Sequence, residues 1–554
     1  MSHGQGVGPQ DVGPQGAGAL GGGALGGGPG EPHYAEPVDP WATGEAAAFG
    51  NVSGSPLLHP GSGAPVSASP VSAGPASSGA RSWLASTDPD PGAQPGSGAK
   101  LPAYKRKGLW VVAGLMVVVL GVAAALAVVF WPGYRALDYQ PLADLHRIKA
   151  AVPVTSAFSA TALRDGRAYF ASVDDNGTLG VVAAAVDTGK TAWSSTEAGI
   201  ASRWEFFFVV PGAVVAISDA DSITRQRRMV LLDSGRGKKL WERTMDADDD
   251  VLFAGDKAVL VDRREGRLVG LAIGDKGAGK WELKNPKDDY GQAATKVVTV
   301  TTGADFTGPA SVGGVPFAEP FDDDERIVQV GADDSARVVD AVSGKVVAGP
   351  RQSVAETDDK RIAHDGRLIV AESADARRLF SYDLEKLEPK VLYTPPTANT
   401  QLDHLTPCGT DRICLVETAG YAAETAQVVA IDAAKGGVVW RRAVANVDRI
   451  VPVGEAVLAT TDRSPVQVSL LDAEGRVSWT RGGAVGRLDA GNTLQFSKVL
   501  STSADDPALA GEHLGDQAVP LGPLDGIRSS TCAWDTTHLA CVAAEDFVVQ
   551  RFAD

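Results

Sequence analysis

The longest apolar stretch of the chain runs from Leu109 to Phe130, 22 residues without a charged side chain. As an α-helix rising about 1.5 Å per residue it would be about 33 Å long, enough to cross the ~30 Å hydrocarbon core of a bilayer. Trp110 and Trp131 stand near its two ends, where aromatic side chains anchor spanning helices. The pattern predicts a transmembrane helix. A buried globular helix is seldom apolar on all sides, and a signal peptide would lie nearer the N-terminus.

After the span the pattern changes to short apolar runs broken by Gly, Asp and Arg, without a helical period, which predicts strands. Seven segments repeat one arrangement: an apolar strand, Asp or an equivalent, a turn that usually holds Gly, and a basic residue leading to an apolar or Trp position. They are AAAVDTGKTAW ending at Trp193, VLLDSGRGKKLW at Trp241, GLAIGDKGAGKW at Trp281, RVVDAVSGKVV at Val347, FSYDLEKLEPKVLY at Tyr393, VAIDAAKGGVVW at Trp440 and SLLDAEGRVSW at Trp479.

The clearest neighbouring copies are 48, 40 and 39 residues apart, the length of one four-stranded propeller blade. The copy AVDTGKTAW, from Ala185 to Trp193, resembles the tryptophan-docking repeat of pyrroloquinoline-quinone-like β-propellers of the BamB type, and the resemblance covers about residues 155–554. It implies an all-β propeller in which the motif tryptophan packs each blade onto its neighbour. These blade-docking residues are Trp193, Trp241, Trp281, Trp440 and Trp479.

Two departures from the repeat are visible. The interval between the third and fourth copies is stretched by residues 284–319, and the fifth copy lacks both the Gly and the Trp. Seven motif hairpins plus Ser530 to Phe552 favour eight blades, with seven as the alternative. Because the last hairpin lacks an outer strand and an open ring would expose unpaired edges, we expect a segment between Leu137 and Ala160 to complete it.

The domain order follows from composition. Residues 1–104 are rich in Gly and Pro and are predicted to form a disordered tail. Residues 105–131 form a basic flank and the span, 132–154 a linker or closing strand, and 155–554 the propeller. Positive residues precede the span, as in Lys105-Arg106-Lys107, which places the tail in the cytoplasm and the propeller outside it in a single-pass protein.

All four cysteines follow the span, which suits an oxidising exterior. Cys408 and Cys414 flank one short turn, and Cys532 and Cys541 flank another, so each pair can reach the Cα separation that a disulfide prefers. We predict the pairs 408 with 414 and 532 with 541. A zinc site is the competing interpretation of these cysteines.

Enzyme signatures are absent from the sequence. It lacks a Gly-x-Ser-x-Gly elbow, a His-Glu-x-x-His motif and a phosphate-binding loop. In quinone-dependent dehydrogenases that share the predicted fold, the cofactor lies against a disulfide of two adjacent cysteines, and this chain has no such pair. His364 and His404 are interpreted as polar turn or strand-end residues. We therefore predict no catalytic residues, no cofactor and no metal, with a quinoprotein-like enzyme as the least favoured alternative.

Charge gives the remaining clue. The net charge is −17, and residues 109–554 hold 61 acidic and 46 basic residues, a net −15. Acidic runs stand before predicted first strands, on connections that share one face of a propeller. The candidate acidic face consists of Asp248, Asp249, Asp250, Asp288, Asp289, Asp322, Asp323, Asp324, Asp358 and Asp359. It would suit a basic protein segment or divalent ions. Alternatively, these residues only keep an exported protein soluble. Nucleic acid is disfavoured by the sign of the charge.

Two functional classes remain. One is a membrane-tethered, non-catalytic scaffold or protein-interaction module of the cell envelope, as the resemblance implies. The other is a sensor that binds an extracellular small molecule or glycan, although the tail holds no folded signalling domain. The Ala, Gly, Val, Asp and Arg-rich composition resembles that of actinobacterial proteins, in which the outer-membrane role of BamB would not apply.

Overall fold

The computed structural model describes residues 134–554 apart from 255–256, 275, 313–323, 374–376, 398, 421 and 462. The predicted tail, basic flank and span lie outside these residues. Within the described part of the chain, none of the helices has the length and apolar character needed to cross a membrane. The residues that the structure describes form 38 strands and two short 3-10 helices, η1 (Gly303–Phe306) and η2 (Ala423–Thr425).

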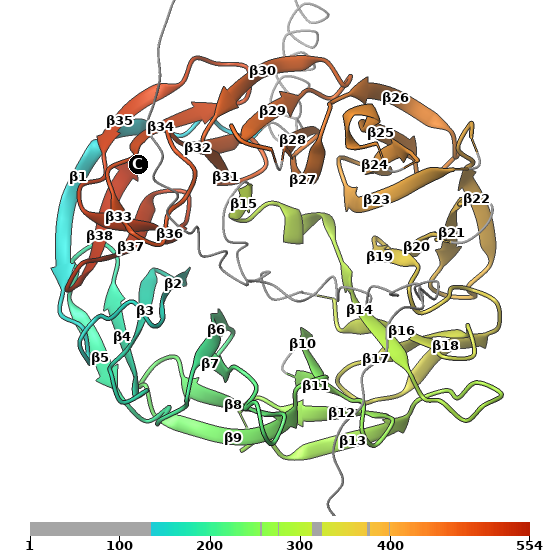
Figure 1. Ribbon diagram of the computed structural model, residues 1–554, viewed down its shortest axis with the longest axis horizontal. Coiled ribbons are helices and arrows are strands. Elements are labelled where there is room, and N and C mark those ends of the chain that lie inside the picture. Colours follow the sequence, from blue (N-terminus) through green and yellow to red (C-terminus); the bar gives the residue numbers. More distant parts are fainter. Residues whose placement is uncertain are drawn as a thin grey trace, which may run out of the picture. The chain divides into compact units, whose positions relative to one another are not determined.

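The strands form consecutive four-stranded antiparallel meanders, here called blades and numbered along the chain (Figure 1). Blade 1 contains β2 (Ser159–Arg164), β3 (Arg167–Val173), β4 (Leu179–Ala185) and β5 (Thr191–Ser195); blade 2 contains β6 (Trp204–Val210), β7 (Ala213–Ser218), β8 (Gln226–Asp233) and β9 (Lys239–Asp246); blade 3 contains β10 (Asp250–Ala254), β11 (Lys257–Asp262), β12 (Arg267–Ala272) and β13 (Gly279–Lys284). Blade 4 contains β14 (Thr295–Thr301), β16 (Arg326–Gly331), β17 (Ala336–Asp340) and β18 (Val346–Arg351); blade 5 contains β19 (Lys360–His364), β20 (Arg367–Ala371), β21 (Leu379–Asp383) and β22 (Pro389–Tyr393).

The C-terminal half continues the pattern. Blade 6 contains β23 (Thr400–Pro407), β24 (Arg412–Ala419), β25 (Gln427–Asp432) and β26 (Val438–Ala443); blade 7 contains β27 (Val447–Val453), β28 (Ala456–Thr461), β29 (Gln467–Leu471) and β30 (Val477–Gly482). Blade 8 contains β31 (Ala484–Arg487), β32 (Asn492–Phe496), β34 (Ala508–His513) and β35 (Val519–Pro523), and β15 (Ala310–Val312) adds to its inner edge. Blade 9 contains β36 (Ile527–Trp534), β37 (His538–Ala543), β38 (Phe547–Ala553) and β1 (Tyr139–Ile148), and β33 (Ala504–Asp505) adds to its inner edge.

The described strands thus give eight hydrogen-bonded sheets but nine meanders, because β14 and β19 join blades 4 and 5 into one sheet. Nine clusters of buried apolar side chains agree with this count, one at each interface between consecutive blades and one between blades 9 and 1. The sequence count of eight omitted blade 8, whose outer hairpin has no Trp.

The ring is closed by a strand from the N-terminal side of the propeller, as predicted. β1, from the N-terminal end of the described chain, pairs antiparallel with β38 at the C-terminus, from Tyr139 opposite Ala553 to Ile148 opposite Phe547. Blade 9 therefore takes its outer strand from the other end of the chain, and the aromatic rings of Phe170 in blade 1 and Phe547 stack at 4.7 Å. This pairing covers the outer edge of β38, which would otherwise have no partner strand.

The motif tryptophans dock on glycines of the next blade. Trp281 donates its indole N–H to the carbonyl of Ala341 at 2.8 Å, and its ring lies on Gly344, where a Cβ would come 2.4 Å from the ring. Gly344 has φ +71°, a left-handed conformation that favours glycine. The same contact joins Trp193 to Gly237, Trp241 to Gly277 and Trp440 to Gly475. In these four motifs, the Gly thus provides the flat surface on which the preceding blade's Trp lies.

Two junctions use a buried glutamate instead. Between blades 7 and 8, Glu512 is 1% exposed and accepts hydrogen bonds from the Trp479 indole at 2.7 Å and from Arg481, whose guanidinium lies 4.4 Å from the Trp479 ring centre. Between blades 5 and 6, Glu417 accepts from the Tyr393 hydroxyl at 2.5 Å and from Arg441. At the fifth motif copy, which lacks Gly and Trp, this charged network therefore accompanies the packing of the buried Tyr393 ring between blades 5 and 6.

Candidate functional site

The connections between strands lie at the two ends of each blade, and hydrogen bonds show which connections lie at the same end. Turns between first and second strands lie beside turns between third and fourth strands, and we call this end the turn face. Connections between second and third strands lie beside the blade-to-blade connections, and we call this end the loop face. Bonds on the turn face include Val186 N–H to Gly166 O (3.1 Å), Ser234 N–H to Gly212 O (3.1 Å), Leu384 N–H to Gly366 O (2.9 Å) and Leu514 N–H to Gly491 O (2.9 Å); those on the loop face include Ala247 N–H to Arg225 O (2.7 Å) and Val354 N–H to Asp334 O (2.9 Å).

The turn face is built from tight turns with one long exception. The connection from β14 to β16 leaves blade 4, forms η1 and pairs as β15 with β31 of blade 8. Ala310 stands opposite Arg487 and Val312 opposite Val485. Blades 5, 6 and 7 separate the two ends of this segment, so it lies across the middle of the ring, as the path from β14 to β15 shows (Figure 1). We call residues 302–312 the crossing segment.

Arg487 holds the crossing segment in place. Its side chain is 3% exposed and donates from Nε to the carbonyl of Gly308 at 2.6 Å and from Nη1 to that of Pro452 at 2.8 Å. The guanidinium also lies 6.0 Å from the ring centre of Phe306, which contacts His364 edge to face at 5.4 Å. His364 donates or accepts at Thr301 Oγ1 (3.1 Å), and burial lowers its pKa. These residues connect blades 4, 5, 7 and 8 near the turn face.

The loop face carries the longer connections and most of the acidic residues singled out from the sequence. Asp248 and Asp249 lie between blades 2 and 3, Asp288 and Asp289 between blades 3 and 4, and Asp358 with Asp359 between blades 4 and 5. Asp250 begins β10 at the same end. Asp324 is a correction: it precedes β16, the second strand of blade 4, and the carbonyl of its neighbour Glu325 accepts from Ala341 on the turn face. Asp322 and Asp323 lie outside the described residues.

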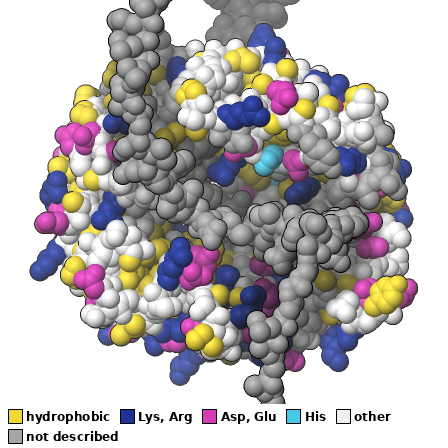
Figure 2. Space-filling view, viewed as in Figure 1, with side chains coloured by type: hydrophobic (Ala, Val, Ile, Leu, Met, Phe, Trp, Pro, Cys, Tyr) yellow, Lys and Arg dark blue, Asp and Glu magenta, His cyan; other side chains and the backbone are white. Residues whose placement is uncertain are grey.

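Many of these carboxylates are engaged within the protein. Asp248 pairs with Arg225 at 2.8 Å, Asp250 with Arg263 at 2.5 Å and Asp324 with Arg326 at 2.7 Å. Asp249 and Asp359 are each 7% exposed and accept one backbone N–H group from their own loop and one from the adjacent connection within the following blade, that of Arg263 or Ser373. Burial raises the pKa of Asp249. On the face seen in Figure 2, acidic and basic side chains are interspersed. Asp289 and Asp358 remain exposed on the loop face.

His404 has a backbone conformation that is unusual within a strand. It lies within β23, the first strand of blade 6, at a bulge between Asp403 and Thr406, and has φ +53°. Water reaches the imidazole, but the surrounding protein still desolvates it and lowers its pKa, against the opposing effects of Asp403 and Asp448. Lys360 lies 3.9 Å from Asp403. His404 is therefore not a strand-end residue, and bulges and positive-φ backbone of this kind are found more often than average beside functional sites.

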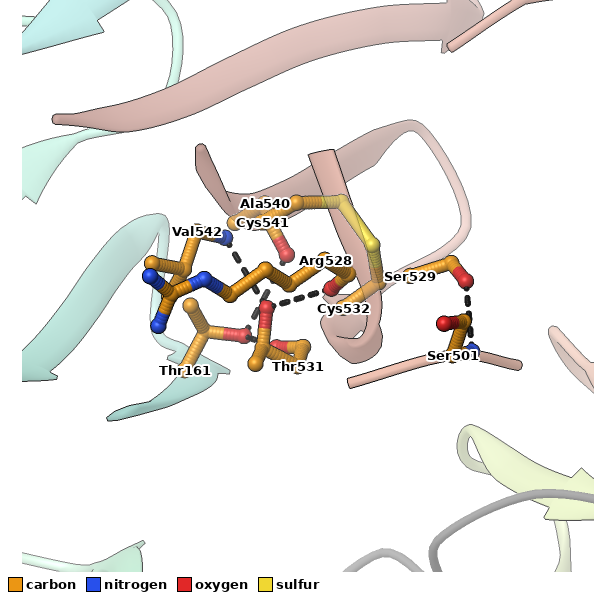
Figure 3. The surroundings of a disulfide bond; sticks show 9 residues. All are labelled: Thr161, Ser501, Arg528, Ser529, Thr531, Cys532, Ala540, Cys541 and Val542. Carbon is orange, nitrogen blue, oxygen red and sulfur yellow. Dashed lines mark hydrogen bonds between the residues drawn. A yellow bond between two sulfur atoms is a disulfide. The ribbon is translucent and has the colours of Figure 1, made fainter. Parts of the chain in front are cut away.

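Both predicted disulfides are confirmed. Cys408 bonds to Cys414 across the turn from β23 to β24, and Cys532 to Cys541 across the turn from β36 to β37. The second lies in blade 9 (Figure 3), and its cysteines pack in the apolar cluster between blades 8 and 9. The neighbouring Ala540 faces blade 1, where Thr161 of β2 donates to its carbonyl at 3.2 Å. Thr531, beside Cys532, accepts from Val542 N–H at 3.0 Å. All four cysteines are buried and none of their thiols is free.

The crossing segment and Arg487 are the site residues that the sequence did not reveal. The signal for them was the stretched interval at residues 284–319, which marks an insertion but not its destination. Arg487 and Gly308 are 179 positions apart. Their contact is a long-range pairing that no local pattern encodes.

Comparisons with known proteins address the repeat architecture. Residues 175–306, from blade 1 to the start of blade 4, match a family model described as outer membrane protein assembly factor BamB, which supports the predicted pyrroloquinoline-quinone-like repeat. No curated protein sequence matches this chain. BamB from Moraxella catarrhalis is 14% identical with a TM-score of 0.37, covering 74% of this chain and 98% of that one. The computationally designed Ika8 protein is 10% identical (TM-score 0.38, 75% and 99%), and a europium-containing methanol dehydrogenase 13% identical (TM-score 0.35, 64% and 85%). At these values the structural matches carry no conclusion about function.

Proposed function

We propose that the chain is a membrane-tethered, non-catalytic interaction module whose propeller lies outside the cytoplasm and binds an envelope protein through its loop face. The observation that carries the proposal is the difference between the two faces. The turn face consists of tight turns and the crossing segment, whereas the loop face displays long connections such as 219–225, 285–294 and 352–359. Loops positioned by a rigid scaffold are where recognition residues concentrate in folded domains.

The exterior location is supported by the two buried disulfides, which persist in oxidising compartments, and by the apolar run at 109–130 with its basic flank. The tether would hold the ring at the membrane while the loop face stays free for a partner. Exposed carboxylates on that face favour a partner with a basic segment.

The test compares the two faces at equal charge. Full-length chain carrying D248N, D289N and D358N on the loop face is compared with chain carrying E385Q, E388Q and D516N on the turn face, each isolated from native membranes at low and high salt. We expect one envelope protein to be retained by wild type and by the turn-face variant, and to be lost from the loop-face variant and at high salt. Equal loss from both variants, or no protein captured by wild type, would contradict the proposal.

A further inference from the structure

The described chain begins on the turn face of blade 8. The carbonyl of Arg135 accepts from Asn492 Nδ2 at 3.0 Å, and the N–H of Leu137 donates to Asn492 Oδ1 at 3.3 Å. Tyr134 lies so close to Gly491 that a Cβ on this glycine would be 2.6 Å from the tyrosine Cβ. The chain then continues past Tyr139, whose hydroxyl donates to the carbonyl of Glu512 at 3.2 Å, into β1 of blade 9.

Gly491 fixes which face this is. It belongs to the turn between β31 and β32, and its carbonyl accepts from Leu514 N–H in the turn between β34 and β35. Both turns belong to the turn face. Moreover, β31 and β32 are the inner strands of blade 8, with β35 outermost. Tyr134 therefore meets the turn face toward the middle of the ring rather than at its rim.

The tether to the predicted span is short. Four residue steps separate Tyr134 from Phe130, the last residue of the apolar run, and an extended chain covers at most about 14 Å in that distance. If the ring stood on its rim, the Gly491 turn, which joins β31 and β32, would be raised from the bilayer by two to three strand spacings, about 10–14 Å. That arrangement would consume most of the reach of the tether, whereas a ring lying with its turn face toward the membrane needs a smaller part of it.

We propose that the turn face of blade 8 rests against the headgroups of the bilayer that holds the chain's own span, so that the loop face points away from the membrane. This inference depends on the membrane tether of the proposed function and adds its orientation. The crossing segment then lies on the membrane side of the ring, and the connections that bear Asp289 and Asp358 point away from the bilayer.

Cysteine labelling tests the orientation, because all four native cysteines are bonded and an introduced one is the sole reactive thiol. Asp516 and Asp525 form a matched pair: both are exposed aspartates attached to blade 8, Asp516 in the β34–β35 turn on the turn face and Asp525 in the connection to blade 9 on the loop face. Full-length D516C and D525C are labelled with a fluorophore and placed in liposomes that carry a short-range quencher on the headgroups. Strands of six residues hold the two faces about 20 Å apart, well beyond contact quenching.

We expect most of the fluorescence to be lost for D516C and little for D525C, and the same order for E474C and R463C in blade 7, which guards against a local effect of one substitution. Equal quenching of both sites, or stronger quenching at D525C, would overturn the orientation. Flotation of the same samples reports the tether separately. Protein that floats with the liposomes but shows the wrong order refutes only the orientation, whereas protein that does not float refutes the tether and the orientation together.

Discussion

Removal of the Glu512 carboxylate tests whether a buried charge network holds blades 7 and 8 together. Glu512 is 1% exposed and accepts hydrogen bonds from the Trp479 indole and from Arg481. Loss of one partner of a buried ion pair costs about 3–5 kcal/mol. Because 33% of the Arg481 side chain remains exposed and water can solvate it, we expect E512A to lose about 3 kcal/mol of unfolding free energy, the lower end of that range.

A second variant separates charge from packing. E512Q keeps an acceptor oxygen but loses the charge, so we expect it to lose about 1–2 kcal/mol, the difference between charged and neutral hydrogen bonds. E474Q serves as the control, since Glu474 pairs with Arg476 on the surface (64% and 70% exposed) and contributes less than about 1 kcal/mol. Urea unfolding midpoints of the full chain, compared at constant m-value, should fall in the order wild type and E474Q, E512Q, E512A. A midpoint of E512A no lower than that of E474Q would refute the network.

Three further predictions concern other parts of the ring. G344A should lower the free energy of unfolding by about 1–3 kcal/mol, because a Cβ at this left-handed position would overlap the Trp281 ring. The loss should be smaller in a W281A background; equal losses in both backgrounds of a double-mutant cycle would argue against the contact. Burial and the bond to Glu417 raise the pKa of Tyr393 above its ordinary value of about 10. Its contribution to stability should therefore be complete below about pH 10 and decline as pH rises further. In urea titrations, the unfolding free energy of Y393F should fall less between about pH 9 and pH 11 than that of wild type. D403N should lower the already depressed pKa of His404, because Asp403 favours the charged imidazole; an unchanged or higher pKa in imidazole NMR titrations would exclude this coupling.

Local sequence patterns accounted for much of the fold. The repeated Asp, Gly and Trp positions located seven outer hairpins because turn geometry and ring packing depend on a few neighbouring residues. Cys408 with Cys414 and Cys532 with Cys541 were predictable for the same reason, since each pair flanks one hairpin turn. The closing strand β1 followed from the need to cover an open edge.

What the sequence missed depends on contacts between distant residues. Blade 8 escaped detection because its outer hairpin has no Trp, and its junction with blade 7 relies on Glu512. The insertion in blade 4 was visible as a stretched interval, but its pairing with β31 was not. Asp324 was assigned to the wrong face because the strand before the insertion, β14, had not been identified as the first strand of that blade.

The candidate site shows the same limit. Blade topology placed most of the acidic residues on the loop face, because every blade-to-blade connection ends there. Their partners could not be inferred, since Arg225 and Arg263 meet Asp248 and Asp250 only after the strands pair. His404 gave no signal in the sequence, because a bulge depends on the register of two strands.

Photo-crosslinking from both faces in native membranes tests the central claim most directly. A photoreactive group is attached to full-length chain at Y290C, beside Asp289 on the loop face, or at E385C on the turn face, each the sole free thiol of its variant. We predict that Y290C forms a protein adduct of defined mass, abolished by high salt, and that E385C does not. The same protein adduct from E385C, or none from Y290C, would contradict recognition through the loop face.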